Sequence, residues 1–155
     1  MAIDIGAGAE NYNSVKVFAL DDTLIDKTNP ANADGTLDTF EIYANTYMAG
    51  VKIGTFFGSG TSWNDRDYES IGNVTSGSKQ TFSGKNCDVV TGDILGIHAD
   101  SGNLEVNTSA GSGFLLIYED TFGQGAKTYT LSDADGKIAV YATGTETSAE
   151  TSVGN

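Results

Sequence analysis

The stretch Thr36–Phe57, TLDTFEIYANTYMAGVKIGTFF, alternates apolar and polar residues in two runs that a short polar connection separates. Phe40 and Ile42 are apolar positions of the first run, and Val51 and Ile53 are apolar positions of the second. A period of two places such side chains on one face of a β-strand. We therefore predict a pair of strands here. Because an isolated pair is marginal in water, its apolar face requires a second sheet from the rest of the chain.

Outside this stretch, short runs of alternating or continuous apolar residues recur between turn-forming residues. The chain has 20 Gly and one Pro, a composition typical of many tight turns, and it shows no helical periodicity. We count about nine or ten strands at a spacing of roughly 8–12 residues, which is the spacing of a sandwich or barrel. The further predicted strands lie at 3–5, 14–20, 23–25, 68–71, 79–83, 87–90, 93–99, 102–107, 113–119, 127–131 and 138–141.

Three connecting segments have distinct predictions. Gly58–Asp67, GSGTSWNDRD, is predicted to be a long polar loop, and Thr91-Gly92 is predicted to be a tight turn between paired strands. Ser132–Gly136, SDADG, is predicted to be a hairpin turn rather than the start of a calcium loop, because no glutamate follows at the twelfth position. The predicted core contains Phe40, Ile42, Val51, Ile53, Ile94, Ile97, Leu115, Ile117, Ile138 and Val140.

Length and charge limit the organisation and the partners. A chain of 155 residues suits one domain, which we predict at residues 1–143, followed by a polar tail at 144–155. The formal net charge of −13 repels phosphate backbones and anionic headgroups, so we expect neither nucleic acid nor membrane as a partner. The N-terminal residues contain no basic region and no long apolar run, so we expect a protein that is made in the cytoplasm without a signal peptide.

Catalytic and metal chemistry lack an obvious residue set. His98 is the only histidine and Cys87 the only cysteine, so we predict a structural histidine, a buried thiol and no zinc site. Glu41, Glu105 and Glu119 lie in predicted strands, but no clustered acid pair of the glycosidase type is present. We predict that the protein is not an enzyme and needs no cofactor or metal.

Four runs together resemble a family of small jelly-roll sandwich domains from tailed-phage virion proteins and related metagenomic proteins. They are Thr23–Thr36 (TLIDKTNPANADGT), Val51–Phe56 (VKIGTF), Gly77–Gly84 (GSKQTFSG) and Val89–Ile97 (VVTGDILGI). The resemblance extends over roughly residues 3 to 145. It implies an all-β fold of two antiparallel sheets, a jelly-roll β-sandwich, and a structural or binding role without catalytic residues.

Two functions follow from these observations. The first is a structural protein of a virus particle, a decoration or cement subunit on a capsid or fibre. It would form a homotrimer, contact a major capsid protein and reside on the virion surface. The alternative is an extracellular carbohydrate-binding or adhesion module. Its glycan would stack on Trp63 beside Asn64, Asp65 and Arg66, unless Trp63 instead folds back to cap the sandwich.

The two chain ends are predicted to be assembly contacts. Met1–Asn11 and Thr143–Asn155 are rich in small and polar residues, which fray in a free monomer. Ordering them costs roughly 1–2 kcal/mol per residue, which neighbouring subunits could offset. We predict Ile3, Ile5 and Val153 as the apolar anchors of these contacts, with strand addition to a sheet edge as the mode.

Overall fold

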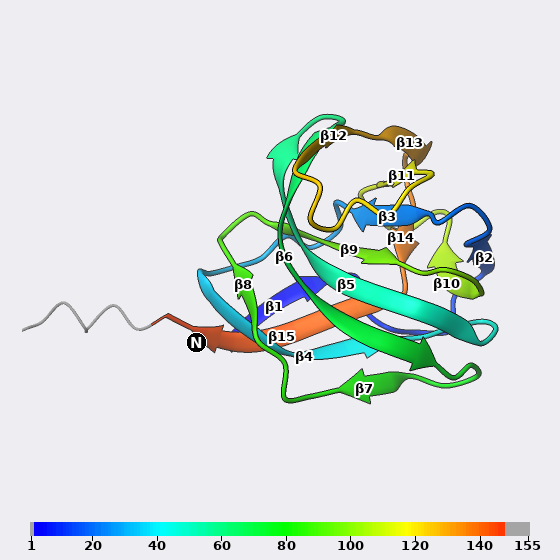
Figure 1. Ribbon diagram of the computed structural model, residues 1–155, viewed down its shortest axis with the longest axis horizontal. Helices are drawn as coiled ribbons and strands as arrows, with labels where there is room; N and C mark the ends of the chain where they lie inside the picture. The colour runs from blue at the N-terminus through cyan, green and yellow to red at the C-terminus, as the bar shows by residue number, and fades with distance from the viewer. Residues whose placement is uncertain (1, 148–155) are drawn as a thin grey trace, which may run out of the picture.

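The computed structural model describes residues 2–147, and within this range the chain forms β-strands and no helix (Figure 1). None of these residues belongs to a helix that is long and apolar enough to cross a membrane. The strands are β1 (Ala2–Gly6), β2 (Ser14–Val17), β3 (Thr23–Asp26), β4 (Gly35–Ile42), β5 (Met48–Ser59), β6 (Ser62–Val74), β7 (Gln80–Phe82), β8 (Cys87–Val89), β9 (Ile94–His98), β10 (Asn103–Asn107), β11 (Phe114–Ile117), β12 (Ala126–Thr128), β13 (Thr130–Asp133), β14 (Lys137–Ile138) and β15 (Val140–Glu146).

Two antiparallel sheets face each other, as the sequence predicted. The first has the order β1-β15-β4-β7, with β8 also paired to β4, and the second has the order β12-β6-β5-β9-β3-β11-β13. A small third sheet, β14-β10-β2, lies at one end of the sandwich (Figure 1).

The order of the principal strands is that of a jelly roll. When β1, β3, β4, β5, β6, β7, β9 and β15 are numbered 1 to 8 along the chain, the first sheet reads 1-8-3-6 and the core of the second reads 2-7-4-5. This interleaving is the double Greek key of the jelly-roll fold. The remaining strands are insertions. β2 precedes the second principal strand, β8 lies between the sixth and the seventh, and β10 to β14 precede the last.

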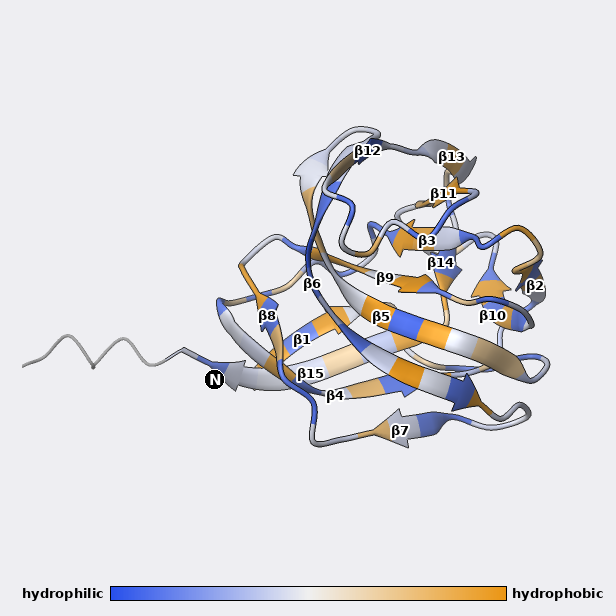
Figure 2. Cartoon of the chain, viewed as in Figure 1, coloured by the Kyte–Doolittle hydropathy of each residue, from blue (hydrophilic) through white to orange (hydrophobic). Residues whose placement is uncertain are grey.

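The two strands of the stretch Thr36–Phe57 lie in opposite sheets, so the prediction that they pair with each other was wrong. β4 pairs with β15, β7 and β8, whereas β5 pairs with β6 and β9. Phe40 of β4 and Ile53 of β5 point into the same core between the sheets. Figure 2 shows the apolar and polar residues that alternate along β5. The period of two identified the buried faces correctly but not the partner strands.

The turn at Thr91-Gly92 also connects the two sheets rather than two paired strands. The backbone N–H of Asp93 donates to the carbonyl of Val90 at 2.9 Å, and Gly92 has a φ of 91°, which glycine adopts without strain. β8 before the turn belongs to the first sheet and β9 after it to the second. The predicted hairpin at Ser132–Gly136 is likewise wrong, since β13 pairs with β11 and β14 with β10.

A second apolar cluster covers part of the outer face of the second sheet. The inserted residues Phe122 and Tyr129 pack on Phe56 of β5, with ring centroids 5.1 Å and 6.3 Å from the Phe56 ring. Ile94 and Leu115, predicted for the main core, belong to this second cluster. The inserted segment thus buries one end of this face, and the other end carries the polar site described below.

The remaining core and boundary predictions have mixed outcomes. All predicted core residues are buried except Ile117, which is half-buried. Cys87 is fully buried as expected, and burial raises the pKa of its thiol to about 12. The predicted boundary between domain and tail at residue 144 was wrong, because β15 continues to Glu146 and stays paired with β4 over its whole length.

Candidate functional site

A polar pocket of about 240 Å³ opens on the outer face of the second sheet. Lys52 of β5, Ser70 of β6 and His98 of β9 line it. Lys52 is paired with both Ser70 and His98, so these side chains form a row across three neighbouring strands. Asp100, just after β9, and Asp120, from the inserted segment, complete the rim. The sheet therefore fixes the floor of the pocket, and two connections supply its carboxylates.

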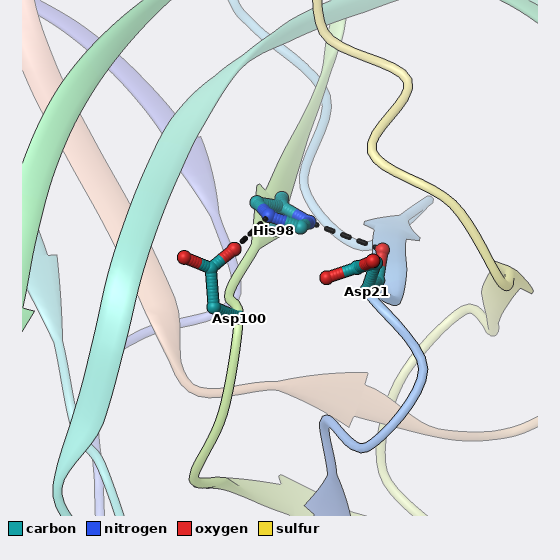
Figure 3. A group of neighbouring side chains, drawn as sticks. All are labelled: Asp21, His98 and Asp100. Carbon is teal, nitrogen blue, oxygen red and sulfur yellow. Dashed lines mark hydrogen bonds and ion pairs between the residues drawn. The ribbon is translucent and has the colours of Figure 1, made fainter.

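The imidazole of His98 is buried, with 2% of its surface exposed, and both of its nitrogens have defined neighbours. Nδ1 lies 3.1 Å from the backbone carbonyl oxygens of both Asp21 and Asp22. Carbonyl oxygens only accept, so Nδ1 carries a proton. Nε2 faces Oδ1 of Asp100 at 3.1 Å and Oδ2 of Asp120 at 3.8 Å (Figure 3 shows Asp100). The backbone thus fixes the orientation of the ring and leaves Nε2 directed at carboxylates.

Asp120 is held in place from both sides. Its Oδ2 accepts a hydrogen bond from Lys52 Nζ at 2.6 Å, and its Oδ1 accepts one from the backbone of Phe122. The hydrogen bond from Lys52 to Asp120 raises the pKa of Lys52, and the Tyr68 ring centroid lies 5.6 Å from the same ammonium group. Lys52 is therefore a permanent cation that balances Asp120.

Backbone conformation brings Asp21 and Asp100 to the imidazole. Asp21 has a φ of 59°, an uncommon conformation for a residue other than glycine. Gly50 has a φ of 65°, and a Cβ added there would lie 2.0 Å from Oδ2 of Asp100. Only glycine at position 50 allows Asp100 this position. The backbone N–H of Asp100 donates to Ala49 at 2.8 Å and fixes the connection.

The geometry does not match a nucleophilic triad. In a Ser-His-Asp triad the carboxylate accepts from Nδ1 and the nucleophile lies at Nε2. Here carbonyls occupy Nδ1, and carboxylates face Nε2. The site therefore directs an imidazole nitrogen and carboxylate oxygens at one another, and these are atoms that can bind a cation.

The residues predicted for glycan binding do not form a platform. Trp63 is only 6% exposed, packs in the second cluster and donates from Nε1 to the carbonyl of Gly60 at 3.0 Å. Arg66 makes a two-pronged ion pair with buried Asp93. Asp65 accepts from the backbone of Gly123 and Gly125, and Asn64 lies in β6 opposite Ala126. The long loop predicted here is instead the tip of the β5–β6 hairpin, and Trp63 caps the sandwich.

The predicted assembly anchors Ile3 and Ile5 are fully buried in the chain's own core, which contradicts that prediction. β1 pairs with β15 along its whole length, so the first residues are ordered without a neighbour. The sequence suggested frayed ends because the partner strand lies more than a hundred residues away. Val153 lies outside the described residues.

Three of the exposed large apolar side chains lie in or just after β2, the edge strand of the small sheet. Val15 is 39% exposed and Val17 is 52% exposed, and Leu20 just beyond the strand is 61% exposed. The strand predicted at residues 14–20 ends at Val17, and the face of β2 that carries Val15 and Val17 is open to solvent. We call Val15, Val17 and Leu20 the β2 patch.

Sequence reasoning missed Lys52, Asp100, Asp120 and Asp21 as neighbours of His98. One local signal was present, since His98 and Asp100 are two residues apart and such residues share a face in extended backbone. Asp21 and Asp120 approach only through the jelly-roll topology and the inserted segment. Comparison of the chain with protein-family models and with curated proteins finds no match.

Proposed function

We propose that this protein is a non-enzymatic structural subunit of a virus particle, a jelly-roll decoration or cement protein on a capsid or fibre. Jelly rolls are common among capsid and lectin domains, so the fold supports the proposal by analogy. The net charge of −13 suits a surface that stays in solvent. The observation that carries the proposal is the β2 patch, because an open edge strand with outward valines is a surface for docking another subunit.

The occupant that we propose for the β2 patch is the neighbouring copy in a homotrimer. β2 ends the order β14-β10-β2, so its outer edge can accept a strand. In a closed trimer each copy presents the patch to a different surface of the next copy. The β2 patch thus takes the place of Ile3 and Ile5 as the proposed assembly contact. The major capsid protein would then contact another face of the subunit.

The test combines light scattering with imaging. The wild-type protein is expected to elute at three times the chain mass, and the double variant Val15→Lys, Val17→Lys at the mass of one chain with an unchanged circular dichroism spectrum. Leu131→Lys is the matched control, because Leu131 is 50% exposed but lies on β13. It should remain trimeric.

Electron microscopy of the source material should then show the protein in regular arrays on particles. A wild-type monomer at all concentrations, together with its absence from particles, would contradict the proposal. The carbohydrate-binding alternative stays a prediction. The positions of Trp63, Asn64, Asp65 and Arg66 in the structure do not support it. Retention on a glycan array by the monomeric protein would favour that alternative.

A further inference from the structure

We propose that a divalent transition-metal ion binds at the edge of the pocket, through Nε2 of His98 and the carboxylates of Asp100, which lines the pocket, and Asp21, which lies beside it, with Zn²⁺ as the ion that the donor set favours. The sequence alone predicted no metal site, because one histidine and one cysteine cannot form a zinc site of the multi-Cys or multi-His kind. The inference is independent of the proposed role in a virus particle.

The buried imidazole is the first argument. Because two backbone carbonyls fix the proton on Nδ1, a neutral His98 presents a lone pair at Nε2. That lone pair faces a carboxylate oxygen of Asp100 at 3.1 Å. Two electron-rich atoms at this distance repel unless a proton or a metal ion neutralises the contact. Hydrogen bonds from Nδ1 to carbonyl groups are also the usual way in which proteins orient a metal-binding imidazole.

The second argument is the position of the carboxylates on either side of the ring (Figure 3). One donor atom from each of Asp21, His98 and Asp100 lies within 4.8 Å of the others. Zinc bonds of about 2.0–2.2 Å to nitrogen and oxygen require ligand atoms somewhat closer than this. Asp21 and Asp100 are exposed, so their side chains can approach the ion without repacking the core.

Charge and space also fit a hydrated dication. Asp21, Asp100 and Asp120 bring three negative charges, and Lys52 cancels one of them through its 2.6 Å contact with Asp120. The excess of two negative charges matches a divalent ion. The pocket of about 240 Å³ next to these groups has room for water ligands that complete the coordination sphere.

The nitrogen donor decides between classes of metal. Ca²⁺ and Mg²⁺ prefer sites made only of oxygen, whereas imidazole suits Zn²⁺ and its transition-metal neighbours. A set of one histidine and two aspartates, with water in the remaining position, consists entirely of zinc ligand types. We therefore expect Zn²⁺ to bind far more tightly than Ca²⁺.

The sole histidine makes the test direct. Protein purified without a histidine tag and labelled with ¹⁵N in its imidazole gives one pair of ring nitrogen signals in an NMR spectrum. On titration with ZnCl₂, the Nε2 signal is expected to move to a metal-bound position and to saturate at one equivalent, while Nδ1 keeps its proton. The same titration with CaCl₂ should leave both signals in place.

Variants and calorimetry then assign the ligands. Asp100→Asn is expected to weaken Zn²⁺ binding at least tenfold, and Asp135→Asn, which changes an exposed carboxylate in the turn after β13, should not weaken it. Lys52→Met should strengthen binding, because it releases Asp120. His98→Gln should abolish binding, and if that variant fails to fold, Asp21→Asn replaces it.

Two outcomes overturn the proposal. The first is ring signals that do not respond to ZnCl₂, which would show that no ion binds between His98 and Asp100. The second is Zn²⁺ affinity that is equal in the wild type, Asp100→Asn and Asp135→Asn, which would place the ion elsewhere on this acidic chain.

Discussion

Among residues 2–147, the Arg66 guanidinium is the sole side-chain partner of the Asp93 carboxylate, which is 2% exposed. Its loss would leave a buried charge with only the backbone N–H of Val90 as donor. We predict that Arg66→Ala lowers the free energy of unfolding by about 3 kcal/mol, measured by urea denaturation. The control is Lys79→Ala. Lys79 is exposed and 3.7 Å from Glu41, so its removal should cost under about 1 kcal/mol. Equal decreases in the free energy of unfolding of the two variants would contradict the prediction that Arg66 stabilises the buried Asp93 carboxylate.

Asp26 gives a pH dependence at the residue scale. It is fully buried, its oxygens accept from the backbone of Thr28 and Ile138, and burial raises the pKa of its carboxyl to about 6. The folded state therefore binds this proton more tightly than the unfolded state, where the ordinary pKa is 3.8. The resulting stability is fully present below about pH 4 and is lost as pH rises through 6.

We predict that, between about pH 4 and pH 7, the free energy of unfolding of the wild type falls by on the order of 3 kcal/mol relative to that of Asp26→Asn. Asn at this position cannot titrate, so the variant lacks this slope. Urea denaturation at a series of pH values measures both proteins. Parallel stability curves would mean that the Asp26 carboxyl titrates normally.

At the scale of elements, β1 is a structural strand of the sandwich. We predict that Ile5→Ala lowers the free energy of unfolding by about 2–5 kcal/mol, because Ile5 is fully buried between the sheets. Leu131→Ala, at an exposed position of β13 outside the β2 patch, should change it by under about 0.5 kcal/mol. Thermal unfolding of both variants provides the measurement. An Ile5→Ala protein with wild-type stability and defective assembly would restore the view of β1 as an intersubunit contact.

Strands and their buried faces could be predicted from sequence, but their partners could not. Phe40 and Ile53 are buried as the period of two required, yet the alternation carries no information about which sheet holds each strand. The turn at Gly92 illustrates the same limit, since its local geometry is that of a tight turn while its strands diverge. Trp63 lies among polar residues in the sequence, and its burial comes from the second apolar cluster and from the pairing of β6 with the inserted β12. The His98 site escaped prediction because its carboxylates come from three separate connections.

At the scale of the whole molecule, charge opposes the proposed trimer. Each copy has a formal net charge of −13, so copies repel at low ionic strength. We predict that raising NaCl from about 0.01 M to about 0.15 M, which shortens the Debye length from ~30 Å to ~8 Å, strengthens trimer formation. Sedimentation equilibrium measures the change. Weaker association with added salt would indicate a basic partner in place of a second copy.

The pairing of β1 with β15 has a consequence for synthesis. Ala2 lies opposite Thr145, so the first sheet cannot close until nearly the whole described chain has left the ribosome. At about 5–20 residues per second, Ile3 and Ile5 wait roughly 7–30 s for their partner strand. Folds dominated by such distant contacts also close slowly, in milliseconds to seconds. A nascent chain that stops before Val140 therefore exposes β1 and one edge of β4 together, and such unpaired strand edges favour aggregation.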